Sequence, residues 1–381
     1  MTLPTFFEML NTLVSSPSVS SLSSELDTSN RAVVDHMANW LHDLDFNVDV
    51  YASSDDWKFN LVARKGRGEG GVLLSGHSDT VPCDPDLWTQ SPFSVTTDDS
   101  KYYGLGTCDM KGFFPVVLEV VQQFKESQLG QPITVLVTAD EESTMAGARH
   151  IATNHPISAD VAVIGEPTDL QPIFAHKGIF VARIRTVGRS GHSSNPTLGI
   201  SALEDMYNAI REIMVFRTEL QKRNNDSVFA VPVPTLNLGC LHAGDSANRI
   251  CGQAELLIDC RILPGMSTTE VVSRLEEQLI ATGLKTDSDI EFELVMPPIE
   301  PFKTPSSSRF IQLMEKLSGR PSGTVAFGTE APFLQQMGIE TVIFGPGSID
   351  QAHQANEYLS LAQIEPAKRA LSQLIHEYCC K

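Results

Sequence analysis

The stretch Val72-Leu73-Leu74-Ser75-Gly76-His77-Ser78-Asp79 decides the fold of this chain. A run of apolar and small residues ends abruptly at a histidine, and an aspartate follows two positions later. Strands this continuously apolar are typical of α/β sheets whose two faces are both covered. In such sheets, ligands bind in the crevice at the carboxyl ends of the strands. His77 and Asp79 therefore lie where a binding site is expected.

The same pattern occurs three more times along the chain. Three further apolar runs each lead into acidic or imidazole side chains: residues 133–137 into Asp140, Glu141 and Glu142, residues 161–165 into Glu166, and residues 341–344, through a Gly-Pro-Gly loop, into His353. Helical segments lie between the runs, notably at residues 113–125. This alternation predicts an α/β fold in which helices sandwich a mixed sheet.

A second domain is expected because the pattern of apolar strands that lead into acidic or imidazole side chains stops near residue 178. Residues 179–187 read as a strand with one wet face, because basic side chains alternate near its end. We expect helices at about 200–222 and 268–281, and strands at 235–241 and 254–262. These elements predict an α+β domain at residues 178–292, inserted into an α/β domain formed by residues 1–177 and 293–381. A chain of 381 residues is long enough for two domains.

Composition excludes several classes of partner. The chain has 28 basic and 47 acidic residues and a formal net charge of −19, which disfavours nucleic acid or an anionic membrane. No apolar stretch reaches the roughly 18 residues of a membrane span, and the N-terminus lacks the features of a signal peptide. The seven cysteines include no Cys-x-x-Cys pair. Free thiols and a cytoplasmic location are the expectation.

His77 and Asp79 lie two positions apart at the end of one apolar run. A lone histidine near a strand end is more often a hydrogen-bonded structural residue than a metal ligand. The aspartate favours the ligand interpretation, because metal-bound histidines usually donate their second N–H to a carboxylate. Asp79 is placed to orient His77 in this way.

Residues 104–112 form a glycine-rich turn that carries one acid, Asp109. A helix cap or a phosphate-binding loop is the alternative interpretation. A dinucleotide loop fits poorly, because Asp109 occupies the place of the third glycine. An aspartate held between glycines suits the bridging of two metal ions. The neighbouring Cys108 is interpreted as a small buried packing residue.

The adjacent acids Glu141 and Glu142 are the sharpest local signal. Carboxylates that meet at a buried strand end repel each other, so a cation is the natural compensation. If one of them binds metal, the other is free to act as a general base. A solvated acidic loop is the alternative for this pair, and Glu166 and His353 taken alone fit simple turn residues.

The candidate ligands together are two histidines, two glutamates and one aspartate. Imidazole and carboxylate without thiolate suit zinc, cobalt or manganese. Five protein ligands exceed what one catalytic zinc takes, so a bridged pair of ions about 3.5–4 Å apart is the economical interpretation.

These motifs resemble the M20 family of dizinc peptidases and deacylases over essentially the whole chain. The resemblance rests on residues 76–82, 104–112, 138–142 and 165–168 and on the loop ending at His353. It implies two Zn²⁺ ions, with Co²⁺ possible, bridged by Asp109. His77 and Glu166 would complete one site, and Glu142 and His353 the other. Asp79 would orient His77, and Glu141 would be the general base.

The resemblance also assigns roles to the inserted domain, as a lid and dimerisation domain of a homodimer. His192 would reach the active site of the partner subunit. Asn248 and Arg261 would hold the substrate carboxylate or stabilise the oxyanion. For Arg261, an ion pair with Asp259 or with another acid is an equally good interpretation.

Residues 141–149, 234–239, 328–332 and 345–349 resemble family members that act on N2-acetyl-L-ornithine. The expected reaction is hydrolysis of its amide to L-ornithine and acetate, a step of arginine biosynthesis. Another amidase of the family, such as a succinyl-diaminopimelate desuccinylase, an aminoacylase or a dipeptidase, is the alternative, because a fold does not set substrate choice. A metal-free binding protein on this scaffold is disfavoured, because every ligand and the base are present.

Overall fold

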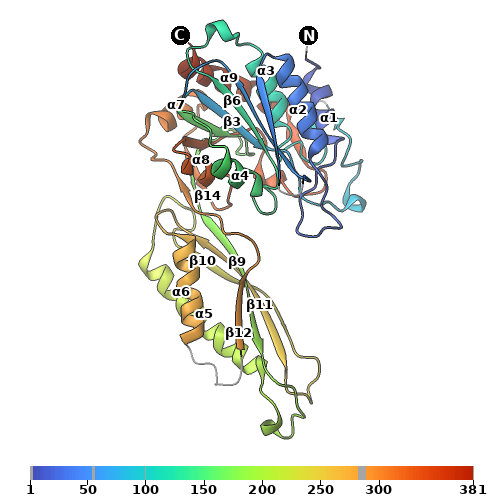
Figure 1. Cartoon of the computed structure of the whole chain (residues 1–381), viewed down its shortest axis with the longest axis vertical. Helices are drawn as coiled ribbons and strands as arrows, with labels where there is room; N and C mark the ends of the chain where they lie inside the picture. Colours follow the sequence, from blue (N-terminus) through green and yellow to red (C-terminus); the bar gives the residue numbers. More distant parts are fainter. Residues whose placement is uncertain (1–2, 54–55, 99, 282–288, 381) are drawn as a thin grey trace. The chain divides into compact units, whose positions relative to one another are not determined.

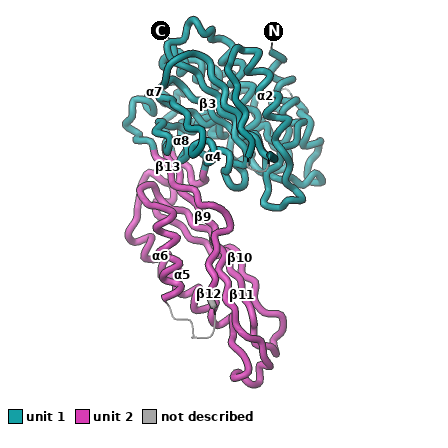
Figure 2. Tube along the Cα trace, in the orientation of Figure 1, with its two compact units in different colours: residues 1–174, 304–323, 329–381 teal, residues 175–303, 324–328 magenta. Residues whose placement is uncertain are grey.

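The structure is a computed structural model that describes residues 3–53, 56–98, 100–281 and 289–380 (Figure 1). The chain forms two compact units (Figure 2). The first unit comprises Met1–Phe174, Thr304–Gly323 and Thr329–Lys381, and the second comprises Ala175–Lys303 and Thr324–Gly328. The second unit thus extends beyond the 178–292 expected from sequence. One reason is the short strand β13 (Phe302–Lys303), which pairs with His176 and Ala175.

A mixed sheet forms the centre of the first unit. In spatial order its strands are β1 (Asn47–Ala52), β2 (Phe59–Lys65), β6 (Ile133–Thr138), β3 (Val72–His77), β7 (Val161–Ile164), β15 (Glu340–Ile343) and β8 (Ile173–His176). Strand β8 also pairs with β13 and with β14 (Gly323–Val325). The strands from β6 to β15 run parallel, and β1, β2 and β8 are antiparallel to their neighbours. The α/β class with a mixed sheet is therefore confirmed.

The parallel strands end at the same edge of the sheet. Every residue of β3, β6 and β7 is buried, as their continuous apolar sequences predict. The register of the strands aligns their carboxyl ends, because His77 of β3 pairs with Thr138 of β6, and Ser75 of β3 pairs with Ile164 of β7. Side chains that follow these strands consequently leave the sheet from neighbouring positions.

Helices flank this sheet in two groups. They are α1 (Phe6–Val14), α2 (Arg31–Asp43), α3 (Phe113–Val121), α4 (Ala146–Asn154), α7 (Arg309–Ser318), α8 (Ala331–Gln336) and α9 (Leu361–Cys379). Helices α3 and α9 pack on β3 with α1 and α7 against them, whereas α2 and α4 pack on β2. Helical spacing predicts an apolar stripe of Val34, Met37, Leu41 and Leu44; the first three are fully buried in α2, whereas Leu44 caps the helix and is half-buried. In the described part of the chain, no helix is long and apolar enough to cross a membrane.

The first unit also contains a small antiparallel sheet. It joins β16 (Tyr358–Ser360), β5 (Lys101–Tyr103) and β4 (Thr96–Thr97). Tyr358 pairs with Tyr103, so the segment that follows His353 runs alongside the segment that leads into the turn at residues 104–112. Two parts of the chain that carry candidate ligands are thereby fixed to each other.

The second unit is an antiparallel sheet with two helices. Its strands lie in the order β10 (Thr235–Ala243), β11 (Gln253–Ile262), β9 (Gly178–Val187) and β12 (Asp289–Leu294). Burial alternates along β9 and β11, and the buried side chains meet α5 (Ala202–Arg223) and α6 (Thr268–Ala281). Sequence predicted this two-helix arrangement but did not identify β12.

Candidate metal centre

Three candidate ligands follow directly from the parallel strands. His77 is the last residue of β3, and Glu166 comes two residues after the end of β7. Glu141 and Glu142 follow β6 in a tight turn in which the carbonyl of Asp140 accepts the N–H of Met145 at 2.6 Å. Asp140 has a left-handed backbone with φ of 59°, a conformation that aspartate tolerates better than most residues.

Asp109 divides its carboxylate between two histidines. Its Oδ1 lies 3.2 Å from Nε2 of His77, and its Oδ2 lies 3.5 Å from Nε2 of His353. His77 and Asp109 are almost fully buried, whereas the His353 side chain is 53% exposed. The two oxygens of this carboxylate thus face two different imidazoles.

Each histidine has a further carboxylate beside it. Nε2 of His353 lies 2.9 Å from Oε2 of Glu142, and Nε2 of His77 lies 3.8 Å from Oε1 of Glu166. The structure thus brings together all five of the residues expected as ligands.

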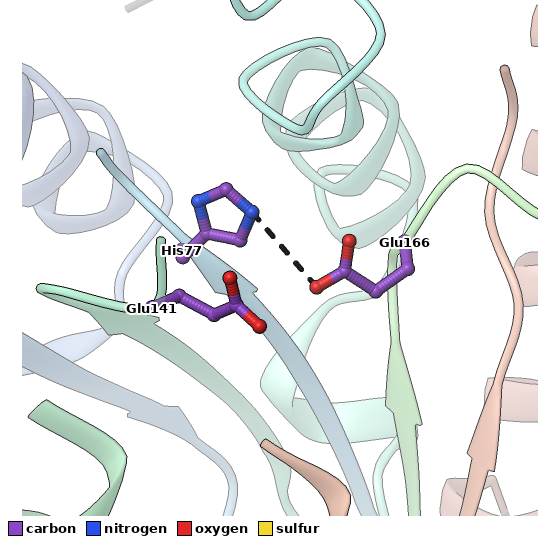
Figure 3. A group of neighbouring side chains, drawn as sticks. All are labelled: His77, Glu141 and Glu166. Atoms are coloured by element: carbon purple, nitrogen blue, oxygen red, sulfur yellow. Dashed lines mark ion pairs between the residues drawn. The ribbon is translucent and has the colours of Figure 1, made fainter. Parts of the chain in front are cut away.

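Glu141 joins the same cluster from the side of Glu166. Among the residues that the structure describes, two sets of side chains offer ligand atoms that all lie within 4.8 Å of one another: His77 with Glu141 and Glu166, and His77 with Asp109 and Glu142. Figure 3 shows the carboxylates of Glu141 and Glu166 turned toward each other beside the ring of His77. The residue expected as general base is therefore adjacent to the expected ligands.

Asp79 contacts His77 differently from the expectation. Nδ1 of His77 lies 2.9 Å from the backbone carbonyl of Asp79, while the carboxylate oxygen Oδ1 is 3.7 Å away. The other carboxylate oxygen accepts the backbone N–H of Glu142 at 3.1 Å. Asp79 thus touches both the β3 end and the turn that carries Glu142.

The cluster is electrostatically strained. Burial raises the pKa of Glu141 and of Glu166 well above the usual value, and neighbouring carboxylates add to the shift. Burial lowers the pKa of His77, but hydrogen bonding to Asp109 and nearby acids reverse this and raise it well above normal. The hydrogen bond to Glu142 raises the pKa of His353 to about 9. All four shifts favour the protonated forms, which reduce the net negative charge of the cluster.

Unsatisfied oxygens show that a cation fits these residues. Among the described residues, Oε1 of Glu142, Oε1 of Glu166 and Oδ1 of Asp79 are buried and have no hydrogen-bond partner. Leaving such atoms unpaired is costly, and a divalent cation satisfies carboxylate oxygens directly. Imidazole and carboxylate donors without thiolate are a set that zinc, cobalt and manganese accept.

Two buried acids near the cluster were not expected from sequence. Glu357 accepts the backbone N–H groups of Gly106, Cys108 and Asp109, and burial raises its pKa to about 8 although these N–H groups oppose the shift. Glu330 accepts the hydroxyl of Thr138 at 2.9 Å, and burial raises its pKa to about 7. Neither acid follows an apolar run directly, so the strand-end pattern did not find them.

Cys108 contributes no ligand atom to the two sets described above. Its thiol is buried and donates to the carbonyl of Ser348 at 3.4 Å, and burial raises its pKa. This fits the packing role expected from sequence. All seven cysteines are free thiols.

The second unit holds the three residues expected from the lid. His192 and Asn248 belong to neighbouring loops, because His192 forms a β-bridge with Arg249 and Ser193 donates to the carbonyl of Asn248 at 3.1 Å. Arg261 lies on β11 opposite Ile179 and forms a two-point ion pair with Asp259, at 2.9 and 3.1 Å. The structure thus unites His192 and Asn248 and separates Arg261 from both.

Comparison with known proteins agrees with this geometry. Residues 73–377 match the family described as Peptidase family M20/M25/M40. The chain is 44% identical over 380 residues to an acetylornithine deacetylase of Pectobacterium atrosepticum, covering 100% of this chain and 99% of that protein. An acetylornithine deacetylase of Klebsiella pneumoniae is 45% identical over 378 residues, with 99% and 98% covered. A tripeptidase of Staphylococcus aureus shares the fold, with a TM-score of 0.76 at 18% identity over 97% of this chain and 96% of that one. The family expected from the motifs is confirmed: the chain belongs to peptidase family M20/M25/M40.

Proposed function

We propose that this protein hydrolyses the amide of N2-acetyl-L-ornithine to L-ornithine and acetate. The observation that carries the proposal is the Asp109 carboxylate shared between His77 and His353, with Glu141 beside it. The choice of substrate is supported by similarity along the whole chain to relatives named acetylornithine deacetylase. A place in arginine biosynthesis follows from that substrate, and the cytoplasmic location stays a prediction.

The cluster would hold two divalent metal ions, Zn²⁺ or Co²⁺. His77 and Glu166 would bind one ion, Glu142 and His353 the other, and Asp109 both. Bound there, the ions would supply Lewis acidity toward the acetyl carbonyl and a water of lowered pKa.

Glu141 would move the proton during the reaction. Its carboxylate lies with Glu166 and His77 at the carboxyl edge of the sheet, where the scissile amide is expected. It accepts a proton from the attacking water while the oxygen bonds to the acetyl carbon. It then delivers that proton to the α-nitrogen as the C–N bond breaks, which gives acetic acid and a neutral amine. Transfer of the acid's remaining proton to the amine gives acetate and the ammonium form of L-ornithine. A single carboxylate serves as base and then as acid.

The lid residues favour a dimeric enzyme. Arg261 and Gln253 lie near opposite ends of β11, roughly 25 Å apart if each residue of the strand advances by the usual rise. The loop that carries His192 lies beyond the end at Gln253, where His192 bridges to Arg249. One small substrate is too short to touch both Arg261 and His192 of the same unit. We therefore propose that His192 and Asn248 serve the site of a second copy. The ion pair with Asp259 holds the guanidinium of Arg261 at its own end of the strand.

A substrate panel tests the proposal. We would measure kcat/KM of metal-loaded protein on acetylornithine, succinyl-diaminopimelate, acetylmethionine and a dipeptide. Acetylornithine should be preferred by at least tenfold. A preference for any other member of the panel would assign the chain to another amidase activity of the family.

A further inference from the structure

Glu357 is a buried acid whose carboxyl accepts hydrogen bonds from the backbone of the turn that carries Asp109. Its side chain is 1% exposed. Oε1 accepts the N–H groups of Cys108 at 2.7 Å and Asp109 at 3.0 Å, and Oε2 accepts the N–H of Gly106 at 3.0 Å. Above its raised pKa of about 8 this carboxyl is ionised, and its three N–H donors then form charge-assisted hydrogen bonds, which are shorter and stronger than neutral ones.

Further contacts hold the rest of this turn in place. The N–H of Gly104 donates to the backbone carbonyl of Glu357 at 3.1 Å, next to the pairing of β16 with β5. Gly106 has a φ of 81°, and a Cβ there would meet Thr80 and Lys111 at 2.9 and 3.2 Å. The turn is therefore an irregular backbone that β16, β5 and Glu357 hold in place.

Asp109 is consequently held from two directions by one short segment. His353 Nε2 lies 3.5 Å from its side-chain Oδ2, and Glu357, four residues further on, binds its backbone N–H. A shift of the 353–357 segment moves both the imidazole and the backbone from which the bridging carboxylate projects. The geometry of the centre on the His353 side depends on this coupling.

We propose that Glu357 is a positioning residue that sets the affinity of the centre for its second divalent cation. This rests on the metal centre of the proposed function. Glu357 does not need to touch either cation, since it acts through the backbone of residues 106–109. Partners that orient metal ligands from behind typically change metal affinity by about 10–100-fold when removed.

The direct test is a metal titration of the Glu357→Gln variant. The amide keeps the size of the side chain but loses the charge and turns an N–H₂ toward a backbone donor. Titration of chelator-treated protein with Co²⁺, followed by calorimetry and by visible absorption, should give two binding events in the wild type. In the variant, the weaker event should lose about 10–100-fold in affinity, and the stronger event less.

Glu315→Gln is the matched control. Glu315 also accepts a backbone N–H from a loop, that of Ser322 at 2.8 Å, but it lies on α7 outside the cluster. This variant should bind both ions like the wild type. If Glu357→Gln lowers the melting temperature yet binds both ions with unchanged affinity, Glu357 is only a structural anchor and the proposal is wrong.

A second variant, Glu357→Asp, tests the same proposal if Glu357→Gln fails to fold. Glu357→Asp keeps the charge but is one methylene shorter, so it cannot reach all three N–H groups in place. It should also weaken the second binding event, and wild-type affinity in this variant would overturn the proposal. A wild type that binds no Co²⁺ would instead refute the metal centre itself, and the inference with it.

Discussion

The imidazole of His353 lies 2.9 Å from the carboxylate of Glu142, although 211 residues separate them in the chain. The whole second unit intervenes in the sequence between them. The half of the centre that holds them therefore combines a segment before the second unit with a segment after it, and the later segment follows β15, which pairs with β7. His77 and Glu166, by contrast, belong to the continuous segment Met1–Phe174.

Replacing His353 should therefore remove one ion and leave the other. In His353→Ala the pair Glu142 and Asp109 loses its imidazole, while His77, Glu166 and Asp109 stay in place. Metal analysis after reconstitution should fall from two ions per chain to about one. His376→Ala, an exposed histidine on α9, is the control and should keep two. Retention of both ions in His353→Ala would exclude His353 as a ligand.

The neighbours Glu141 and Glu142 should separate catalysis from metal binding. Glu141→Ala should still bind two ions and lose at least ~100-fold in kcat, the scale of a general base. Glu142→Ala should lose metal, because its carboxylate is the one that faces His353. Steady-state kinetics together with metal analysis check both variants. Near-normal turnover in Glu141→Ala would show that another group handles the proton.

The sequence could predict the strand ends because their signal is local. A buried parallel strand needs a run of apolar residues, and the first polar side chains after that run must leave the sheet at its edge. His77, Glu141, Glu142 and Glu166 were found in this way. Asp109 needed a different clue, a glycine turn, because it does not follow a strand of the central sheet.

Glu357 and Glu330 could not be predicted, because their partners are distant in sequence. Glu357 binds N–H groups 248 to 251 residues away, and Glu330 binds Thr138, 192 residues away. No spacing in a single sequence encodes such pairs. The orientation of Asp79 is similar, since its backbone carbonyl lies closer than its carboxylate to Nδ1 of His77. Whether backbone or side chain makes that contact depends on tertiary geometry.

Glu330 should make metal-free protein less stable as pH rises. Burial raises its folded pKa to about 7 from an ordinary 4.5. Below pH 4.5 the carboxyl is protonated in both the folded and the unfolded state, so burial of this group does not lower the free energy of unfolding. Between pH 4.5 and 7, Glu330 ionises in the unfolded state but stays protonated in the folded state, so the free energy of unfolding falls as pH rises. Above pH 7 the carboxyl is ionised in both states, and the loss of folding stability is complete. Glu330→Gln should therefore be more stable than wild type at pH 8 by up to about 3 kcal/mol, and equal near pH 4.5.

Urea unfolding of chelator-treated protein at several pH values measures this difference. Glu315→Gln provides a contrast of opposite sign, because hydrogen bonds from Ser322 lower the pKa of Glu315. That variant should lose stability above the ordinary carboxyl pKa and match wild type in acid. A pH-independent difference for Glu330→Gln would mean that the buried carboxyl keeps one protonation state throughout.

Mixing two inactive variants should reveal whether His192 serves a second copy. Glu141→Ala lacks the base but has an intact His192, and His192→Ala has the reverse. In a mixed dimer, one site combines the intact Glu141 of one chain with the intact His192 of the other, and the second site lacks both. Random exchange of subunits at equal concentrations should thus restore about a quarter of wild-type activity. Each variant incubated alone is the control and should stay inactive. Because His192 and Arg261 stand at opposite ends of the sheet in the second unit, we expect this recovery. Its absence under conditions where subunits exchange would mean that His192 acts within its own chain or not at all.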